Sequence, residues 1–178
     1  MKKSQFAFVA ALALAFIPWT ASAQQNPVSS SIRTTVSRQA QNLVGAAEEM
    51  PPGDYGFKPT PEQMSFGQLM LHVAKSNSFL CSKISGQTGP DFSKLTETSP
   101  KDDLVAAVKS SASFCNTALA SVDDSGLGQQ VTVFGNRQMP KAAAMIALTN
   151  DLADHYSQSA IYLRLKGHLP PTARRREM

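Results

Sequence analysis

The scarcity of several residue types excludes whole classes of protein for this 178-residue sequence. Two cysteines are too few for a disulfide-dense mini-protein, and 10 glycines and 11 prolines are too few for a collagen-like or low-complexity chain. The sequence contains no phosphate-binding glycine loop, nucleophile elbow or Cys-x-x-Cys pair. It also lacks the basic stripe or module expected of a nucleic-acid-binding protein. Because 42% of the residues are hydrophobic, we expect one folded domain. Because no basic stripe is present, we expect no nucleic-acid partner.

The only long apolar run lies near the N-terminus. Lys2 and Lys3 precede twelve apolar residues, 6–17, and Ala21-Ser22-Ala23 follows as a small-x-small cleavage signal. This order predicts a secretory signal peptide over residues 1–23, because a membrane helix needs about 20 apolar residues. An uncleaved N-terminal anchor is the alternative. No later stretch is long enough to span a bilayer, so we expect a periplasmic or secreted protein with no membrane span after cleavage.

The excess of basic over acidic residues comes from the two ends of the sequence. Loss of Lys2 and Lys3 with the signal peptide leaves 15 basic and 13 acidic residues, which lowers the net charge from +4 to +2. The remaining excess lies in Arg174-Arg175-Arg176. We expect residues 172–178 to form a solvated basic tail, with contact to an anionic lipid or polyanion as the alternative.

Apolar residues recur at helical spacing in four segments between residues 27 and 167. Each predicted helix has about 20 residues and is therefore roughly 30 Å long. Val28 and Ile146 are among the residues assigned to the buried stripes. The expected helix ends are capping residues, prolines and glycines: Asn26, Pro27 and Pro51-Pro52 for the first helix; Ser65, Gln68 and Gly86 for the second; Ser99-Pro100 and Ser125-Gly126 for the third; Pro140 and Gly167 for the fourth.

A short strand or hairpin is expected just before the fourth helix. Val131 and Val133 alternate with polar residues, and Gly135-Asn136 is a turn-forming pair. The segment is too small to make a sheet protein. Length and pattern therefore predict an all-α fold, a four-helix bundle over residues 24–171.

The two cysteines bear on the order of the helices. Residues 86–100 could reach back along a whole helix at about 3.3 Å per residue, so the second and third helices could be parallel. Cys81 follows the cap Ser65 by sixteen residues, and Cys115 follows Ser99 by the same number. If the two helices are parallel, the two cysteines lie at the same level along the helix axes. This predicts a Cys81–Cys115 disulfide, with two separate buried thiols as the alternative.

The three histidines are the main candidates for chemistry. Asp151 and His155 are separated by four residues, so their side chains share one helix face and could chelate a metal. An ordinary helix-surface ion pair explains the same spacing. His72 fits either a metal ligand or a hydrogen-bonded interior side chain. At the end of the fourth helix, we expect His168 to be exposed to solvent or to face the helix dipole. Spacing alone leaves the metal and structural interpretations open.

The sequence resembles the DinB family over essentially the whole mature chain. The resemblance rests on two groups of residues: 50–62, 65–69 and His72 in the first; 154–158, 162–167 and Pro170-Pro171 in the second. It implies an up-down-down-up four-helix bundle with a crossover between helices two and three. It also implies a divalent metal held by three histidines, one in the second helix and two in the fourth.

Carried onto this sequence, the resemblance implies the ligands His72, Asp151 and His155, with aspartate where the family has its first helix-four histidine. Two histidines and one carboxylate suit Zn²⁺, or alternatively Fe, Mn or Ni. The same substitution also fits a member that has lost its metal. The resemblance leaves a homodimer open, but nothing in the sequence marks an interface.

Two functions follow from these observations. The first is an exported, metal-dependent hydrolase or transferase acting on an unknown small molecule, with no catalytic residue assigned. The second is a non-catalytic helical bundle, a binding or stress-related module without the metal. The sequence does not decide whether the protein is an enzyme.

Overall fold

The computed structural model describes residues 25–174. The predicted signal peptide and the last four residues of the predicted tail lie outside this range. The elements, in chain order, are helix α1 (Pro27–Glu49), turn η1 (Pro52–Asp54), helices α2 (Phe66–Ser85) and α3 (Lys101–Leu119), turn η2 (Asp124–Gly126), strand β1 (Gln130–Val133), turn η3 (Phe134–Asn136), strand β2 (Arg137–Pro140), and helices α4 (Lys141–Leu165) and α5 (Pro171–Arg174). The predicted all-α bundle with a small hairpin is confirmed. No helix within residues 25–174 is long and apolar enough to cross a membrane.

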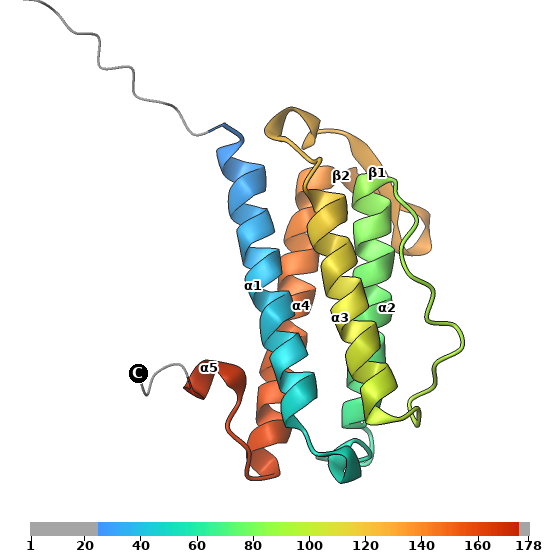
Figure 1. The fold of residues 1–178 in the computed structure, drawn as a ribbon. Coiled ribbons are helices and arrows are strands. Elements are labelled where there is room, and N and C mark those ends of the chain that lie inside the picture. Colours follow the sequence, from blue (N-terminus) through green and yellow to red (C-terminus); the bar gives the residue numbers. More distant parts are fainter. Residues whose placement is uncertain (1–24, 175–178) are drawn as a thin grey trace, which may run out of the picture.

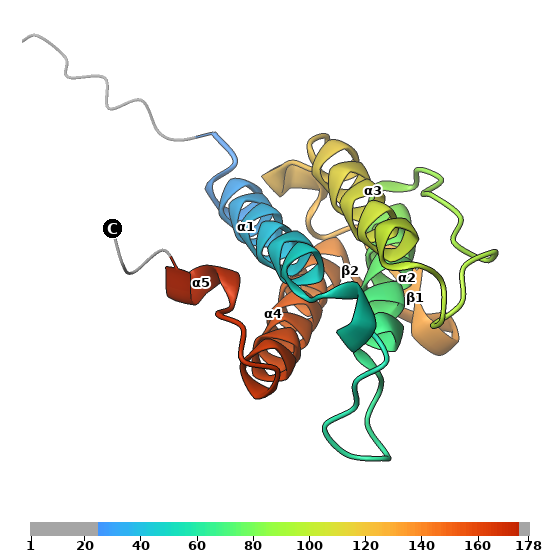
Figure 2. The same cartoon turned by 60° about the horizontal axis from the view of Figure 1, so that its bottom comes forward.

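The four long helices pack around one core. Helix α1 lies against α3 and α4, and α2 lies against the other sides of the same two helices. Figure 1 shows α2 and α3 running in the same direction, with the segment 86–100 returning along the outside of the bundle. Figure 2, seen closer to the end of the bundle, shows the same arrangement of the four helices. The up-down-down-up topology and its crossover are therefore as expected.

Helix α2 begins and ends as the sequence predicts. The Ser65 hydroxyl accepts from the Gln68 amide at 3.1 Å, and the Gln68 side chain accepts from the Ser65 amide at 2.7 Å. This reciprocal capping box satisfies two backbone donors at the helix start. The helix ends at Gly86, whose φ of 78° is a left-handed conformation that favours glycine.

Helix α1 begins at Pro27 as predicted, but the side chain of Asn26 does not cap it. Asn26 adopts a left-handed conformation, with a φ of 56°, and its side-chain oxygen accepts from the Asp124 amide at 3.0 Å. The Asp124 carboxylate instead accepts from the amides of Val28, at 3.1 Å, and Ser29, at 2.7 Å. A residue almost one hundred positions away thus caps α1, and its negative charge lies at the positive end of the helix dipole.

The start of α3 differs from the prediction by one residue. Helix α3 begins at Lys101, and its first carbonyl acceptor is Pro100, which receives bonds from the amides of Asp103 and Leu104. The Ser99 hydroxyl does not cap this helix, because it accepts from the amide of Thr96 at 3.0 Å. Ser99 therefore closes the preceding turn.

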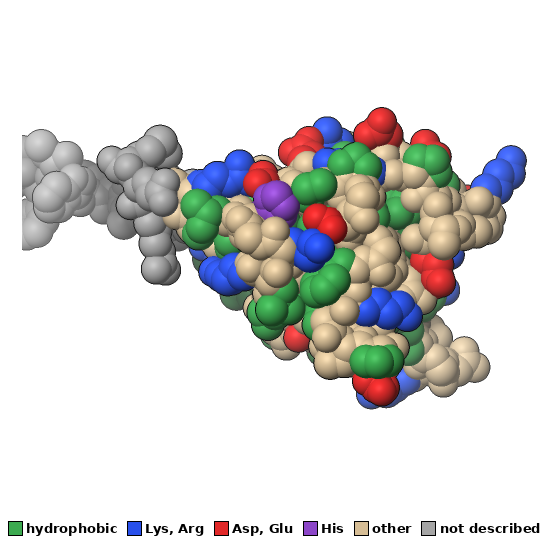
Figure 3. Space-filling model, turned by 90° about the horizontal axis from the view of Figure 1, so that it is seen from below, with side chains coloured by type: hydrophobic (Ala, Val, Ile, Leu, Met, Phe, Trp, Pro, Cys, Tyr) green, Lys and Arg blue, Asp and Glu red, His purple; other side chains and the backbone are tan. Residues whose placement is uncertain are grey.

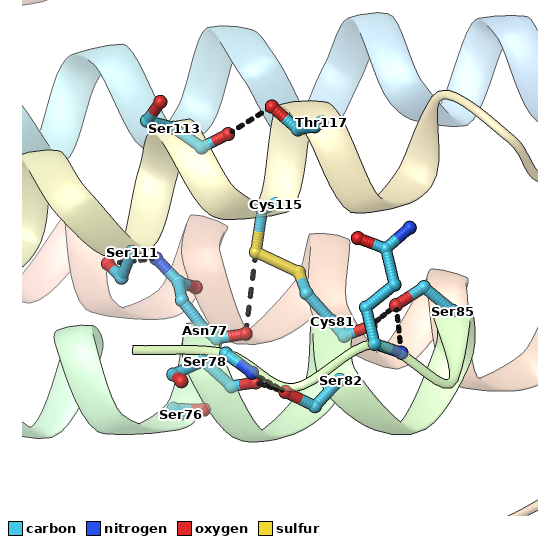
Figure 4. The surroundings of a disulfide bond; sticks show 12 residues. Ser76, Asn77, Ser78, Cys81, Ser82, Ser85, Ser111, Ser113, Cys115 and Thr117 are labelled. Carbon is cyan, nitrogen blue, oxygen red and sulfur yellow. Dashed lines mark hydrogen bonds between the residues drawn. A yellow bond between two sulfur atoms is a disulfide. The ribbon is translucent and has the colours of Figure 1, made fainter. Parts of the chain in front are cut away.

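A disulfide joins α2 to α3. Cys81 and Cys115 are bonded, with their Cα atoms 5.3 Å apart, and both are buried in the core. One turn away, the Asn77 side-chain amide donates to the Ser111 hydroxyl at 3.4 Å, as Figure 4 shows beside the disulfide. Both pairs have the same sequence separation of 34 residues, which requires the two helices to be parallel. The predicted pairing is confirmed.

Two residues assigned to buried stripes are on the surface instead. Val28 and Ile146 are both 51% exposed. In each case the neighbouring residue occupies the inward position, since Ser29 and Met145 are fully buried. Neighbours on a helix lie about 100° apart around its axis, and at these two positions the core-facing direction is taken by Ser29 and Met145.

Part of the predicted tail belongs to the folded unit. Residues 171–174 form α5, which lies against α1. The Thr172 hydroxyl lies 2.8 Å from the Tyr156 hydroxyl, which also accepts from the Thr172 amide at 3.1 Å. The Arg174 guanidinium pairs with Glu49 at the end of α1. The bundle therefore extends to Arg174.

Candidate metal centre

Helices α2 and α4 bring the three predicted ligands together. His72 comes from α2, whereas Asp151 and His155 come from successive turns of α4. One donor atom from each residue lies within 4.8 Å of the others. The imidazole rings of His72 and His155 meet nearly at right angles, with their centroids 4.8 Å apart. These three side chains therefore form a group that could hold a metal ion.

The Asp151 carboxylate has two different neighbours. Its Oδ1 lies 3.3 Å from His155 Nε2, and its Oδ2 accepts a hydrogen bond of 2.7 Å from the Ser76 hydroxyl. Ser76 lies one turn after His72 on α2, so the two helices contribute one i, i+4 pair each. The sequence analysis missed Ser76. Its spacing from His72 is the only local signal that would have found it.

His155 is the most enclosed member of the group, at 9% exposure. Neither of its ring nitrogens makes a hydrogen bond of good geometry, although Nε2 lies within ion-pair distance of Asp151. A buried polar atom without a partner is costly in a folded protein. An imidazole lone pair without a hydrogen-bond donor is what a metal ligand requires, so the residues present fit a divalent ion.

Electrostatics favours the protonation states that metal ligands need. Burial lowers the pKa of His72, and the neighbouring His155 lowers it further, which outweighs the opposing effect of Asp151. Burial alone would raise the pKa of Asp151, but His155 and Ser76 together hold it below its usual value. A neutral His72 and an ionised Asp151 are both competent to bind a cation.

The group is reachable from solvent. His72 is exposed, and it lines a groove of about 480 Å³. The walls of this groove combine apolar side chains, which include Met64 and Leu95, with polar ones, which include Gln68 and Glu97. Lys75 lies on the same groove, one turn after His72. A small molecule could therefore approach the His72 side of the centre.

The third histidine, His168, and the acidic neighbour of His155 lie outside the group. His168 Nδ1 is 4.0 Å from Glu49 Oε1 near the end of α1, and it is half-buried. Asp154 is exposed and accepts from the Gln158 side chain at 2.8 Å.

At the end of the bundle seen in Figure 3, positive and negative side chains of the described residues are interspersed with apolar ones. This end therefore carries no patch of a single charge sign within the described part of the chain.

Comparison with known families gives the group its context. The family model of the DinB superfamily matches residues 35–159, which is more than half of the chain and includes all three donors. The chain belongs to the DinB superfamily. This membership agrees with the resemblance seen in the sequence. It places the His72, Asp151 and His155 group within a metal-binding superfamily.

Solved structures from three bacteria are among those with a similar fold. A DinB-like protein from Bacillus subtilis has a TM-score of 0.62 at 19% identity, with 78% of this chain and 92% of that chain covered. A DinB-like protein from Bacillus cereus has a TM-score of 0.68 at 14% identity, with coverage of 80% and 95%. A conserved protein from Enterococcus faecalis has a TM-score of 0.60 at 14% identity, with coverage of 79% and 96%. At such low identity, these likenesses establish the fold only.

No curated protein matches the sequence.

Proposed function

We propose that this protein is an exported member of the DinB superfamily that binds one divalent metal ion through His72, Asp151 and His155. The proposal extends to a metal-dependent hydrolase or transferase acting on a small molecule. Zn²⁺ is the first candidate, and Fe, Mn or Ni are the alternatives, because two imidazoles and one carboxylate suit all of them.

One observation carries the metal-binding proposal. Three donor groups from two helices converge within 4.8 Å, and the enclosed His155 lacks a good hydrogen bond at either ring nitrogen. A plain helix-surface pair of Asp151 and His155 would explain neither the approach of His72 nor the burial of His155. The convergence therefore favours a metal site over a surface ion pair.

The residues of the chain define what such a centre would do. A divalent ion supplies Lewis-acid activation of a bound electrophile, and three protein ligands leave a coordination position open. His72 faces the groove, so the open position would be approached from that side. The apolar side chains of the groove would contact the body of a small molecule, and its polar side chains, which include Lys75 and Glu97, could hydrogen-bond to it.

Metal analysis of protein purified without a metal-affinity tag tests the binding proposal. We expect close to one equivalent of a divalent metal after reconstitution, and a large loss of bound metal in His72→Ala and His155→Ala. His168→Ala serves as the matched control, because this histidine lies outside the group. A wild-type protein that retains no metal after reconstitution would rule the proposal out.

Export is a separate part of the proposal. The signal-like segment over residues 1–23 and the Cys81–Cys115 disulfide support it, since disulfides form mainly in oxidising compartments. N-terminal sequencing of the protein from its native host is expected to begin at Gln24, in a periplasmic or secreted fraction. Recovery of the unprocessed chain from the cytoplasm would contradict export.

The presence of Asp151 in place of the family's histidine favours a second function. In this alternative the protein is a non-catalytic binding or stress-related module that has lost its metal. It predicts that His72→Ala and His155→Ala leave both stability and phenotype unchanged. The metal analysis separates the two functions.

A further inference from the structure

Ser76 differs from Ser82 and Ser85 on the same helix α2 in the partner of its hydroxyl. The hydroxyls of Ser82 and Ser85 donate to carbonyls one turn back in their own helix, as helical serines commonly do. Ser76 is 9% exposed, and its hydroxyl instead reaches across to α4 and donates to Asp151 Oδ2 at 2.7 Å. A buried hydroxyl that contacts a neighbouring helix needs an explanation beyond helix formation.

This hydrogen bond accounts for which carboxylate oxygen of Asp151 faces His155. With Oδ2 held by Ser76, Oδ1 is the oxygen that lies beside His155 Nε2, at 3.3 Å. The Asp151 side chain is 28% exposed, so a carboxylate without this restraint can rotate toward solvent. Ser76 therefore restricts Asp151 to an orientation that presents one anionic oxygen to the centre.

We propose that Ser76 is a positioning residue for Asp151 and fixes the carboxylate oxygen that Asp151 would present to a metal. The inference rests on the proposed metal-binding function. A carboxylate is shorter than an imidazole and offers two equivalent oxygens. A hydrogen bond from a residue that is not itself a ligand, which fixes the rotation of the side chain, therefore matters more for a carboxylate ligand than for an imidazole ligand.

Metal affinity of the Ser76→Ala variant tests the proposal. Titration with Zn²⁺ alone, against a competing chelator, should give a dissociation constant about 10- to 100-fold higher than that of the wild type. The absorption spectrum of the Co²⁺-loaded protein should also change, because the carboxylate ligand is no longer fixed. Ser78→Ala is the matched control. Ser78 is also buried on α2, but its hydroxyl donates to the Pro90 carbonyl, away from Asp151.

The Asp151→His background makes the test specific. With histidine at position 151 the carboxylate is absent, so Ser76→Ala should leave Zn²⁺ affinity nearly unchanged there. An equal loss in both backgrounds would overturn the positioning role, because the effect would then not act through the carboxylate. Unchanged affinity and an unchanged Co²⁺ spectrum in the single Ser76→Ala variant would overturn it as well.

A measurement on metal-free protein separates failure of this inference from failure of the proposed function. Urea unfolding of the wild type, both single alanine variants and the double variant measures the coupling between Ser76 and Asp151. A metal-binding wild type without coupling overturns the positioning role alone. A coupled pair in a protein that binds no metal overturns the proposed function, and with it any role of Ser76 toward a metal.

Discussion

The side chain of Asp124 holds the start of α1 from a distant part of the sequence. Its two oxygens accept from the first free amides of the helix, at Val28 and Ser29. The bond from the Ser29 amide is the main reason that the pKa of Asp124 lies below its usual value. A carboxyl group with a lowered pKa stabilises the fold only while it is ionised.

Removal of this carboxylate should therefore have a pH-dependent effect. At pH 7 we expect Asp124→Ala to lower the melting temperature, because the α1 amides lose their acceptor. The stabilisation is complete above the unfolded-state pKa of about 3.9 and is lost as the pH falls through the lower folded-state value. The difference in melting temperature between the wild type and Asp124→Ala should thus become smaller below about pH 4. Asp124→Asn, which keeps an uncharged acceptor, should remove this pH dependence, and a constant difference across the range would contradict the assignment.

Gly67 allows the crossover segment to approach α2 closely. A Cβ atom at this position would lie 2.7 Å from the backbone oxygen of Glu97. Helix propensity favours alanine over glycine by up to about 1 kcal/mol, but a clash with backbone costs about 1–3 kcal/mol. We expect Gly67→Ala to lower the free energy of unfolding, measured in urea. Gly53→Ala is the control, because nothing lies within 4 Å of its added Cβ, and a more stable Gly67→Ala protein would contradict the contact.

The sequence predicts the candidate centre only in part, and the reason is the range of each contact. The pairing of Asp151 with His155 is local, since four residues make one helical turn. The approach of His72 followed from the family resemblance rather than from any spacing. The bond between Ser76 and Asp151 joins residues 75 positions apart, and no local pattern specifies such a contact.

Among the elements, the disulfide between α2 and α3 should contribute most as a single bond. It closes a segment of 34 residues, and such a bond typically stabilises the fold by about 2–4 kcal/mol through the unfolded state. We expect the Cys81→Ala/Cys115→Ala protein to unfold at correspondingly lower urea concentration. Reduction of the wild type should give the same midpoint. Two titratable thiols in denatured, unreduced protein would show that the bond is absent.

Helix positions are well predicted because their ends are marked by short-range chemistry. The capping box of Ser65 and Gln68 and the prolines after α1 place helix ends to within a residue. The end of α3 is one exception, because the helix ends at Leu119 and not at the expected Ser125-Gly126, which belongs to the separate turn η2. The roles of Asn26 and Ser99 are the others. Each side chain finds a different partner, Asn26 through a tertiary contact with Asp124 and Ser99 through the turn at Thr96. Capping residues indicate where a helix begins but not which group satisfies its amides.

At the scale of the whole molecule, a bound metal would join the adjacent helices α2 and α4. A ligand that binds only the folded state, present at 100 times its dissociation constant, adds about 2.7 kcal/mol to the free energy of unfolding. For a domain of this size, this corresponds to a rise in melting temperature of roughly 5–10 °C. We expect Zn²⁺ to raise the melting temperature by this amount and a chelator to reverse the rise. The His155→Ala protein should not respond, whereas His168→Ala should respond like the wild type. No rise in the wild type at saturating Zn²⁺ would argue against binding to the folded state.

The path of the chain between Cys81 and Cys115 has a consequence for limited proteolysis. The whole crossover, residues 86–100, lies between the two bonded cysteines, so a single cut there divides the backbone without separating the pieces. One fragment would carry α1 and α2, and the other would carry α3 and α4. The nicked protein should migrate as one band on a non-reducing gel and as two bands after reduction.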